Sequence, residues 1–313
     1  MTAPETTRPQ RLSQGGSEGL RQVQSTFRPG RRRSKRVRPL AVLLQVILIG
    51  AALIMISPLI FGLLASVSPL DQILSRNGGI LPRVWEWGTY AQAWTTANFS
   101  RYFLNSLIVT ALVVVLDTLA SSMTGYVLAR RQLRGQRLLE GLYVGTLFVG
   151  LTTATLYPQY VIAEALGLDN LLGIALVQLA GIMLVHIFLI KAFVIGLGTE
   201  MEDAARVDGC GLFGTYWRVT FPLMRPILAT TVILGFQASW NNYQVPLVFS
   251  LAAPDLRTLV VGVSALQYDA AEGMTPYNTV LAGANLALVP IVVIFVLLQR
   301  HFVRGWTEGS VKG

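Results

Sequence analysis

Six long apolar stretches follow one another along the 313-residue chain and are separated by more polar connections. They cover approximately residues 40–64, 103–128, 142–163, 171–190, 227–249 and 280–298. An apolar stretch of about 20 residues is long enough to cross the hydrocarbon core of a bilayer as a helix. The pattern therefore predicts an all-α transmembrane protein whose six spans occupy residues 40–313.

The composition agrees with a lipid environment. Hydrophobic residues make up 53% of the chain and charged residues only 13%, which is about half the charged share of a soluble domain. A single cysteine and two histidines leave no material for a disulfide framework or a cluster of these residues around a metal. The sequence also lacks the Gly-x-x-x-x-Gly-Lys-Ser/Thr loop that binds nucleotide phosphates. We therefore expect no catalytic site, no metal site and no cofactor bound by this chain.

Residues 1–39 form a basic segment without apolar periodicity. Residues 1–40 contain ten arginine or lysine residues and two glutamates, so most of the net charge of +9 lies in this segment. Such a composition predicts a disordered tail. The cluster Arg31-Arg32-Arg33-Ser34-Lys35-Arg36 directly precedes the first span. This position favours contact with anionic lipid at the cytoplasmic face over the alternative, nucleic-acid binding.

Charged residues in the short connections predict the orientation of the spans. The connection between the second and third spans carries four arginines and no acid: Arg130, Arg131, Arg134 and Arg137. Such a loop should be cytoplasmic, and the basic tail lies an even number of crossings away from it. The loop between the third and fourth spans holds Glu164 and Asp169 without a base, as expected outside. Both termini are therefore predicted to be cytoplasmic.

The two outer connections, residues 65–102 and 251–279, are long enough for short surface helices. The first contains aromatic residues that typically sit at a membrane interface: Trp85, Trp87, Tyr90 and Trp94. Prolines inside the predicted spans tend to kink a helix, and there are four of them: Pro58, Pro158, Pro246 and Pro290. Kinked spans are compatible both with a transporter that changes shape and with a static bundle.

Residues 199–226, between the fourth and fifth spans, contain the most informative pattern. Thr199 and Glu202 have the spacing of a capping box, and acidic residues in a first helical turn favour helix formation. Gly209 is placed to end this short helix in a left-handed conformation. A second helical run around residues 213–220 is expected to stop before Pro222. Spacing alone leaves two interpretations open, a plain amphipathic connector and a surface helix pair with a mechanical role.

This segment resembles the EAA loop of the permease subunits of ABC importers. The matching residues are Asp203-Ala204-Ala205, then Gly209, then Val219-Thr220-Phe221-Pro222. Asp203 stands where the family usually has Glu, and Cys210 where its carbohydrate branch usually has Ala.

Further stretches resemble maltose-type permeases, over roughly residues 40–313. They are 236–247 with its Trp240-Asn241 pair, 102–107, 125–130 and the C-terminal 305–313. The closest match within that family is the six-span subunit of the permease pair.

The resemblance implies a six-helix type I ABC importer permease fold with a cytoplasmic coupling helix over residues 200–208. That helix would seat in a cleft of a separate ATPase dimer, which would bind ATP and Mg, while this chain does no chemistry itself. A second permease would complete a heterodimer in the bacterial inner membrane, and an extracytoplasmic binding protein would deliver the solute. The implied coupling residues are Glu202, Asp203, Ala204, Ala205, Asp208, Gly209 and Pro222.

The solute implied by the resemblance is a sugar or sugar-like molecule, with a polyol or a glycerophosphate-type compound as the alternative. Trp240, Asn241, Asn242 and Tyr243 are candidates for the translocation pathway, because amide and aromatic groups suit sugars; packing within the bundle is the other interpretation. Asp117 is an acid near the middle of a span, and we expect it to pair within the bundle with a hydroxyl such as that of Ser121. His186 is expected to be a hydrogen-bonding bundle residue. The two together give only thin support to a proton-coupled carrier.

Overall fold

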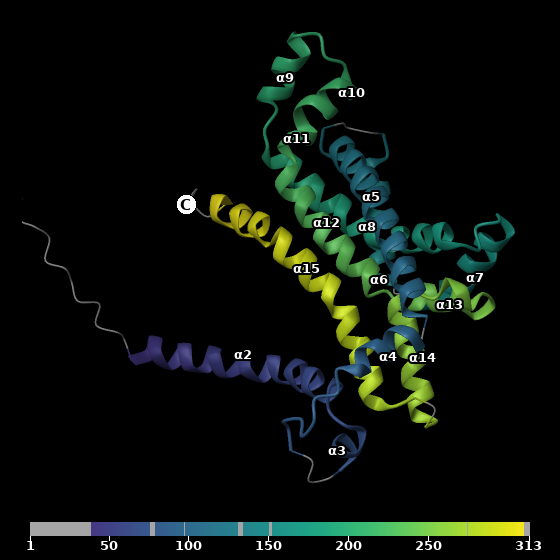
Figure 1. Cartoon of the computed structure of the whole chain (residues 1–313). Coiled ribbons are helices and arrows are strands. Elements are labelled where there is room, and N and C mark those ends of the chain that lie inside the picture. Colours follow the sequence, from purple (N-terminus) through teal and green to yellow (C-terminus); the bar gives the residue numbers. More distant parts are fainter. Residues whose placement is uncertain are drawn as a thin grey trace, which may run out of the picture. The chain divides into compact units, whose positions relative to one another are not determined.

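The computed structural model describes residues 39–75, 79–96, 98–130, 134–149, 152–273 and 275–309, and every regular element in these ranges is a helix (Figure 1). The chain divides into two units, residues 1–56 and 57–313. The first unit contains most of α2 (Pro39–Ser66), an apolar helix that matches the first predicted span. The predicted disordered tail, apart from residue 39, lies outside the described residues.

Three of the other predicted spans are single helices of the second unit. They are α5 (Phe99–Arg130), α8 (Leu171–Gly196) and α15 (Tyr277–Gly309). Together with α2, these are the four helices in the described part of the chain that are long and apolar enough to cross a membrane. They confirm the first, second, fourth and sixth predicted spans.

The third predicted span is described on both sides of a short gap, and the fifth is divided into two helices. The third is represented by α6 (Gln136–Val149) and α7 (Thr152–Ala165), and the residues between them are not described. The fifth is represented by α12 (Arg225–Trp240) and α13 (Gln244–Ala252). The fifth span breaks between Trp240 and Gln244, so Pro246 does not lie inside a continuous helix. It is instead placed in the first turn of α13, where a missing donor costs little.

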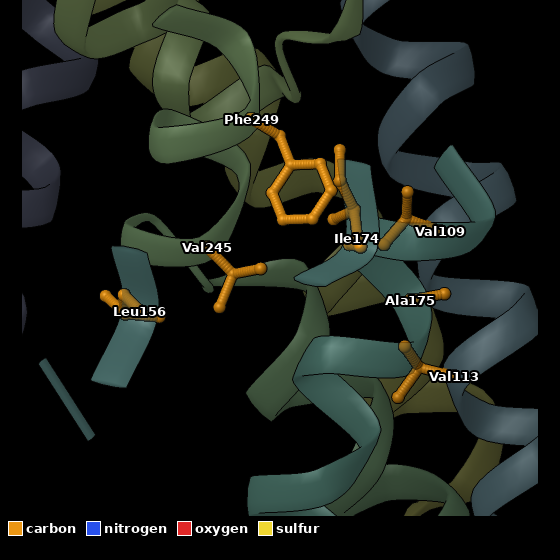
Figure 2. Packing of buried hydrophobic residues seen from close by; sticks show 8 residues of the cluster. Val109, Val113, Leu156, Ile174, Ala175, Val245 and Phe249 are labelled. Carbon is orange, nitrogen blue, oxygen red and sulfur yellow. The ribbon is translucent and has the colours of Figure 1, made fainter. Parts of the chain in front are cut away.

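The core of the second unit lies where α5 and α8 pack against each other and against the ends of α7 and α13. Figure 2 shows this apolar cluster, with Val109 and Val113 from α5, Ile174 and Ala175 from α8, and Phe249 from α13. A Cβ atom at Gly125 would lie 2.9 Å from Cγ2 of Ile190 and 3.0 Å from the carbonyl oxygen of Ile187. Because such distances are too short for a real side chain, glycine is required where the backbones of α5 and α8 approach each other.

The outer connections contain the predicted short helices. They are α3 (Leu70–Leu74), α4 (Gly88–Thr96), the 3-10 turn η2 (Pro254–Leu256) and α14 (Leu259–Ala271). Gln72 holds the first connection together, because it donates to the carbonyls of Gly79 and Leu81 and accepts from the amide of Arg83. Trp85 and Trp87 stack with ring centroids 5.9 Å apart and remain more than half exposed, which suits the predicted interfacial position.

Candidate functional site

The connection between α8 and α12 is a compact chain of short helices beyond the end of α12 (Figure 1). It consists of α9 (Glu200–Val207), α10 (Leu212–Thr215), the π-helix η1 (Tyr216–Thr220) and α11 (Phe221–Leu223). The run 212–223 meets α12 at an angle of 77°. The bend directs this connection away from the axis of α12, so α9 is displayed at the end of the helical bundle.

Glu202 is the centre of a buried hydrogen-bond network that joins three elements. Its Oε1 accepts from Arg130 Nε at 2.9 Å and from Thr220 Oγ1 at 3.2 Å. Its Oε2 accepts from the hydroxyl of Tyr126 at 3.4 Å. Arg130, the last residue of α5, also donates to the carbonyl of Gly198, just before α9. Since Glu202 is only 3% exposed, this network ties α9 firmly to α5 and η1.

The capping box predicted between Thr199 and Glu202 does not form. Thr199 stands at the N-cap of α9 with ψ of −7° and makes no side-chain cap hydrogen bond. A capping side chain normally works from an extended backbone, and the Glu202 carboxylate is already engaged by Arg130. The charge-assisted bond to the guanidinium is the stronger one, so the glutamate turns inward rather than back toward the N-cap.

Gly209 ends α9 as predicted. Its φ is +83°, in the left-handed region where a side chain is strained. The amide of Gly209 donates to the carbonyl of Arg206 at 3.0 Å, and the amide of Cys210 donates to the carbonyl of Ala205 at 2.9 Å. These bonds satisfy the last carbonyls of the helix. No other heavy atom lies within 4 Å of a Cβ built at Gly209, so the backbone conformation is the reason for glycine at this position.

The helix α9 has one anchored face and one free face. Glu202 and Ala205 are buried against the bundle. Met201, Ala204 and Val207 follow one another at a spacing of three residues and are all exposed, Val207 to 88%. We call these three residues the outer face of α9. The outer face of α9 is therefore apolar and exposed, while the opposite face is anchored to the bundle.

The remaining predicted coupling residues lie at the edges of this face or behind it. Asp203 is exposed and forms a surface ion pair with Arg206, with an N–O distance of 2.9 Å. Asp208 is exposed at the C-cap of α9. Pro222 does not stop the second helical run, as the sequence predicted; it lies half-buried in the short helix α11, which continues from η1.

Trp240 and Asn241, two of the predicted pathway residues, differ in burial. Trp240 is 1% exposed, packs against Phe236 and Phe103, and donates from Nε1 to the carbonyl of Ala287 at 3.1 Å. It therefore joins α12 to α5 and α15 as a packing residue. Asn241 follows it at the end of α12, is exposed, and lines a hollow of about 540 Å³.

The other two pathway residues lie at the break between α12 and α13. Asn242 accepts through Oδ1 from the amide of Val245 at 3.1 Å and so caps α13. It also lines a cavity of about 700 Å³ between α6, α7, α8, α12 and α13. Tyr243 is half-buried, and its hydroxyl accepts from Ser264 Oγ at 3.4 Å. The break in the fifth span thus presents amide groups between the helices.

Asp117 and His186 form a buried pair between α5 and α8. Oδ2 of Asp117 lies 2.5 Å from Nδ1 of His186, and the two residues are 0% and 3% exposed. The expected pairing with the Ser121 hydroxyl is wrong, because that hydroxyl donates to the backbone carbonyl of Asp117. The prediction that His186 is a hydrogen-bonding bundle residue is confirmed.

Arg130 and Gln178 are residues whose place in a site the sequence reasoning missed. In the sequence, Arg130 was used only to predict the orientation of the spans. Its position at the end of a span, together with an acidic residue in a later cytoplasmic helix, could have suggested an ion pair with Glu202. Gln178, a lone amide inside the apolar fourth span, lies on the wall of the 700 Å³ cavity. A polar residue in a span faces protein or water, which was the available signal.

A bundle with several helices that are long and apolar enough to cross a membrane is the fold of a multi-span membrane protein. Residues 27–308 match the model of the family described as "Binding-protein-dependent transport system inner membrane component". The chain belongs to this family and is thus an inner-membrane component of an ABC importer.

Curated relatives cover most of the chain. The "Probable ABC transporter permease protein YurM" of Bacillus subtilis (strain 168) is 33% identical over 257 residues, which are 82% of this chain and 83% of that protein. The "Arabinooligosaccharides transport system permease protein AraQ" of Halalkalibacterium halodurans is 34% identical over 270 residues, 84% and 93% of the two chains. The "Melibiose/raffinose/stachyose import permease protein MelC" of Bacillus subtilis (strain 168) is 30% identical over 236 residues, 75% and 84% of the two chains.

A solved structure has the same fold. It is described as a bacterial ABC transporter involved in the import of the acidic polysaccharide alginate. The match has a TM-score of 0.71 and 23% identity, and it covers 86% of this chain and 98% of that one. This likeness establishes the fold as that of a type I ABC importer permease.

Proposed function

We propose that this chain is one of two permease subunits of an ABC importer that carries a sugar or sugar-like solute across the bacterial cytoplasmic membrane. A second permease completes the translocation pathway, and an extracytoplasmic binding protein delivers the solute. A separate ATPase dimer binds ATP and Mg and drives the cycle. Relatives with import functions for arabinooligosaccharides and for melibiose, raffinose and stachyose support the choice of a sugar.

The observation that carries this proposal is the two-faced helix α9. Its buried face is fixed to α5 by the ion pair between Glu202 and Arg130, while its outer face is exposed. A push on the outer face is therefore transmitted directly to a membrane-spanning helix, because the buried ion pair leaves α9 little freedom to move alone. This is the mechanical property that a coupling helix needs.

The same contact supports the cytoplasmic orientation. Arg130 at the end of α5 touches Glu202 in α9, so the connection after the second span and the connection after the fourth span lie at the same end of the bundle. The arginine-rich segment that begins at Arg130 favours the cytoplasm. The coupling helix and the ATPase then meet on the cytoplasmic side, and the termini are predicted to lie there as well.

The proposal is tested by affinity purification of the tagged chain from its own membrane, with mass spectrometry of the proteins that remain bound. We expect an ABC ATPase and a second permease in the complex. Ala204→Asp and Val207→Asp place a charge on the outer face, which must lose its water on docking. Each should lower the recovered ATPase by about tenfold or more while the second permease is retained.

Ala91→Asp is the matched control, because Ala91 is an exposed alanine of the outer helix α4. This variant should retain the ATPase. Recovery of the ATPase at the normal level from both Ala204→Asp and Val207→Asp would exclude α9 as the coupling surface.

A further inference from the structure

The cavity between α6, α7, α8, α12 and α13 has a wall that is polar but uncharged. Its volume of about 700 Å³ is within the usual range for a small-molecule site. Besides apolar side chains and glycines, five hydrogen-bonding residues line it: Thr146, Thr155, Gln159, Gln178 and Asn242. Among the described residues, the wall includes no Asp, Glu, Lys or Arg. Two apolar wall residues, Leu156 and Val245, are labelled in Figure 2.

Within the described structure, only the oxygen of the Gln178 side-chain amide has a hydrogen-bond partner. The residue is 3% exposed, and its Oε1 accepts from Ser239 Oγ at 2.7 Å. Its Nε2 is one of five buried side-chain atoms that find no partner within the described structure. The other four belong to Asp117, Thr118, Thr258 and Thr279, none of which lies on the wall of this cavity. A buried donor without a partner costs about 1–3 kcal/mol, so a group that binds it would recover that cost.

Asn242 also lines this cavity, at the break between α12 and α13. Its Oδ1 is occupied by the amide of Val245, so Nδ2 is left for a further partner. In both residues a protein donor holds the amide oxygen, so a solute would bind the amide nitrogen. Nε2 of Gln178 is covered in this conformation, and a solute reaches it only when the wall side chains move. The two amide N–H₂ groups can donate hydrogen bonds to oxygen atoms of a bound solute.

We propose that this cavity is a binding site for an uncharged, hydroxyl-rich solute, a neutral saccharide, with Gln178 and Asn242 donating to its hydroxyl or ring oxygens. Hydroxyl groups of such a solute can both accept from these amides and donate to the side-chain oxygen of Gln159. The inference rests on the proposed function, since it places the site on the transport pathway of this chain. It narrows the solute to neutral rather than acidic saccharides.

The absence of a cation from the described wall is the reason for that restriction. A carboxylate or phosphate group that leaves water for a site without a positive partner carries a large desolvation cost. Recognition of such anions typically uses arginine or lysine. Uncharged amides and hydroxyls instead suit sugar hydroxyls, whose desolvation is offset by neutral hydrogen bonds.

The test uses the complete importer in proteoliposomes, with its second permease, ATPase and solute-binding protein. ATP-driven uptake is measured for three neutral probes, arabinotriose, melibiose and diacetylchitobiose, and for the anionic probe trigalacturonate. We expect uptake of at least one neutral probe and none of trigalacturonate. Gln178→Met keeps the length of the side chain and removes the donor, so it should lower the maximal uptake rate of that probe roughly three- to tenfold. ATP hydrolysis without solute should stay unchanged.

Gln45→Met is the matched control, because Gln45 is an exposed residue of α2 that does not line this cavity; its uptake should be normal. Gln159→Met changes a half-buried wall residue and replaces Gln178→Met if that variant fails to assemble. Uptake at the normal rate by the assembled wall variants, or uptake of trigalacturonate in place of all three neutral probes, would overturn the inference. Transport of no neutral probe would count against it equally. Failure of the unmodified chain to bind an ATPase would instead refute the proposed function.

Discussion

Replacement of Glu202 by alanine tests whether the buried ion pair is what fixes α9 to the bundle. The carboxylate is 2.9 Å from Arg130 Nε, and the two side chains are only 4% and 7% exposed. Removal of one partner leaves the guanidinium facing a site without its counter-charge, which costs about 3–5 kcal/mol for a buried pair. Because the pair joins α9 to the end of α5, this cost should appear as local opening of the α9 connection. The membrane-spanning helices should stay folded.

The chain carries its own reporter of that opening. Cys210 is its single cysteine; it follows α9, is partly exposed, and its amide is bonded to Ala205. Labelling by a maleimide therefore follows the opening of this segment in the unmodified sequence. A free-energy change of 3–5 kcal/mol corresponds to a factor of about 10² to 10³ or more in the opening equilibrium. Since the thiol is already partly exposed, we expect a smaller rise in labelling rate, of at least about tenfold.

A double-mutant cycle separates the pair from its surroundings. Arg130→Ala should also raise the labelling rate, and the double variant should be less open than the sum of the two effects, because no unpaired charge remains. Asp203→Ala is the control, since its ion pair with Arg206 lies at the surface and such pairs contribute little. Additive effects of the two changes, or unchanged labelling in Glu202→Ala, would refute the reasoning.

Three further changes test other contacts. Gly209→Val should strain the left-handed backbone by about 1–2 kcal/mol and reduce ATP-driven uptake with normal membrane insertion, whereas Gly209→Asn should be milder; equal uptake by the two would contradict this. Gly125→Leu should sharply lower the yield of folded permease by size-exclusion chromatography, because the new Cβ would meet Ile190 at 2.9 Å. His186→Leu leaves the buried Asp117 carboxylate unpaired and should destabilise the permease by about 3 kcal/mol or more, seen as a lower melting temperature; Asp117→Asn combined with His186→Gln should recover most of it.

The sequence predicted the spans well where apolar length alone decides the structure. Four spans were found as single helices because an uninterrupted run in lipid has only one way to satisfy its backbone. The fifth span is not a single helix, since apolar length cannot show where a helix breaks. A proline does not mark the break by itself, because Pro58, Pro158 and Pro290 lie inside helices, whereas Pro246 lies in the first turn of α13.

In the α9 connection, local signals and tertiary contacts gave different outcomes. The end of the helix at Gly209 depends on the backbone conformation of one residue, so the sequence predicted it correctly. The beginning of the helix depends on which partner Glu202 chooses. Its nearest partner along the chain is the N-cap amide, but the structure supplies Arg130, which lies 72 residues away. A capping motif therefore predicts well where a helix begins. It predicts the orientation of the acidic side chain only when no cation competes for it.

Polar residues within the spans show why the sequence could indicate a site without locating it. Each such residue needs a hydrogen-bond partner or water, and lipid offers neither. Asp117, His186 and Gln178 are therefore expected to face the interior of the bundle. Which of them pair depends on the rotation of α5, α8 and α12 about their axes. In the structure, Asp117 pairs with His186 and Gln178 accepts from Ser239. Nε2 of Gln178 has no hydrogen-bond partner within the described structure. A buried donor without a partner, on a residue that lines a cavity, indicates solute contact more strongly than Trp240 does, because the indole N–H of Trp240 is already bound to the carbonyl of Ala287.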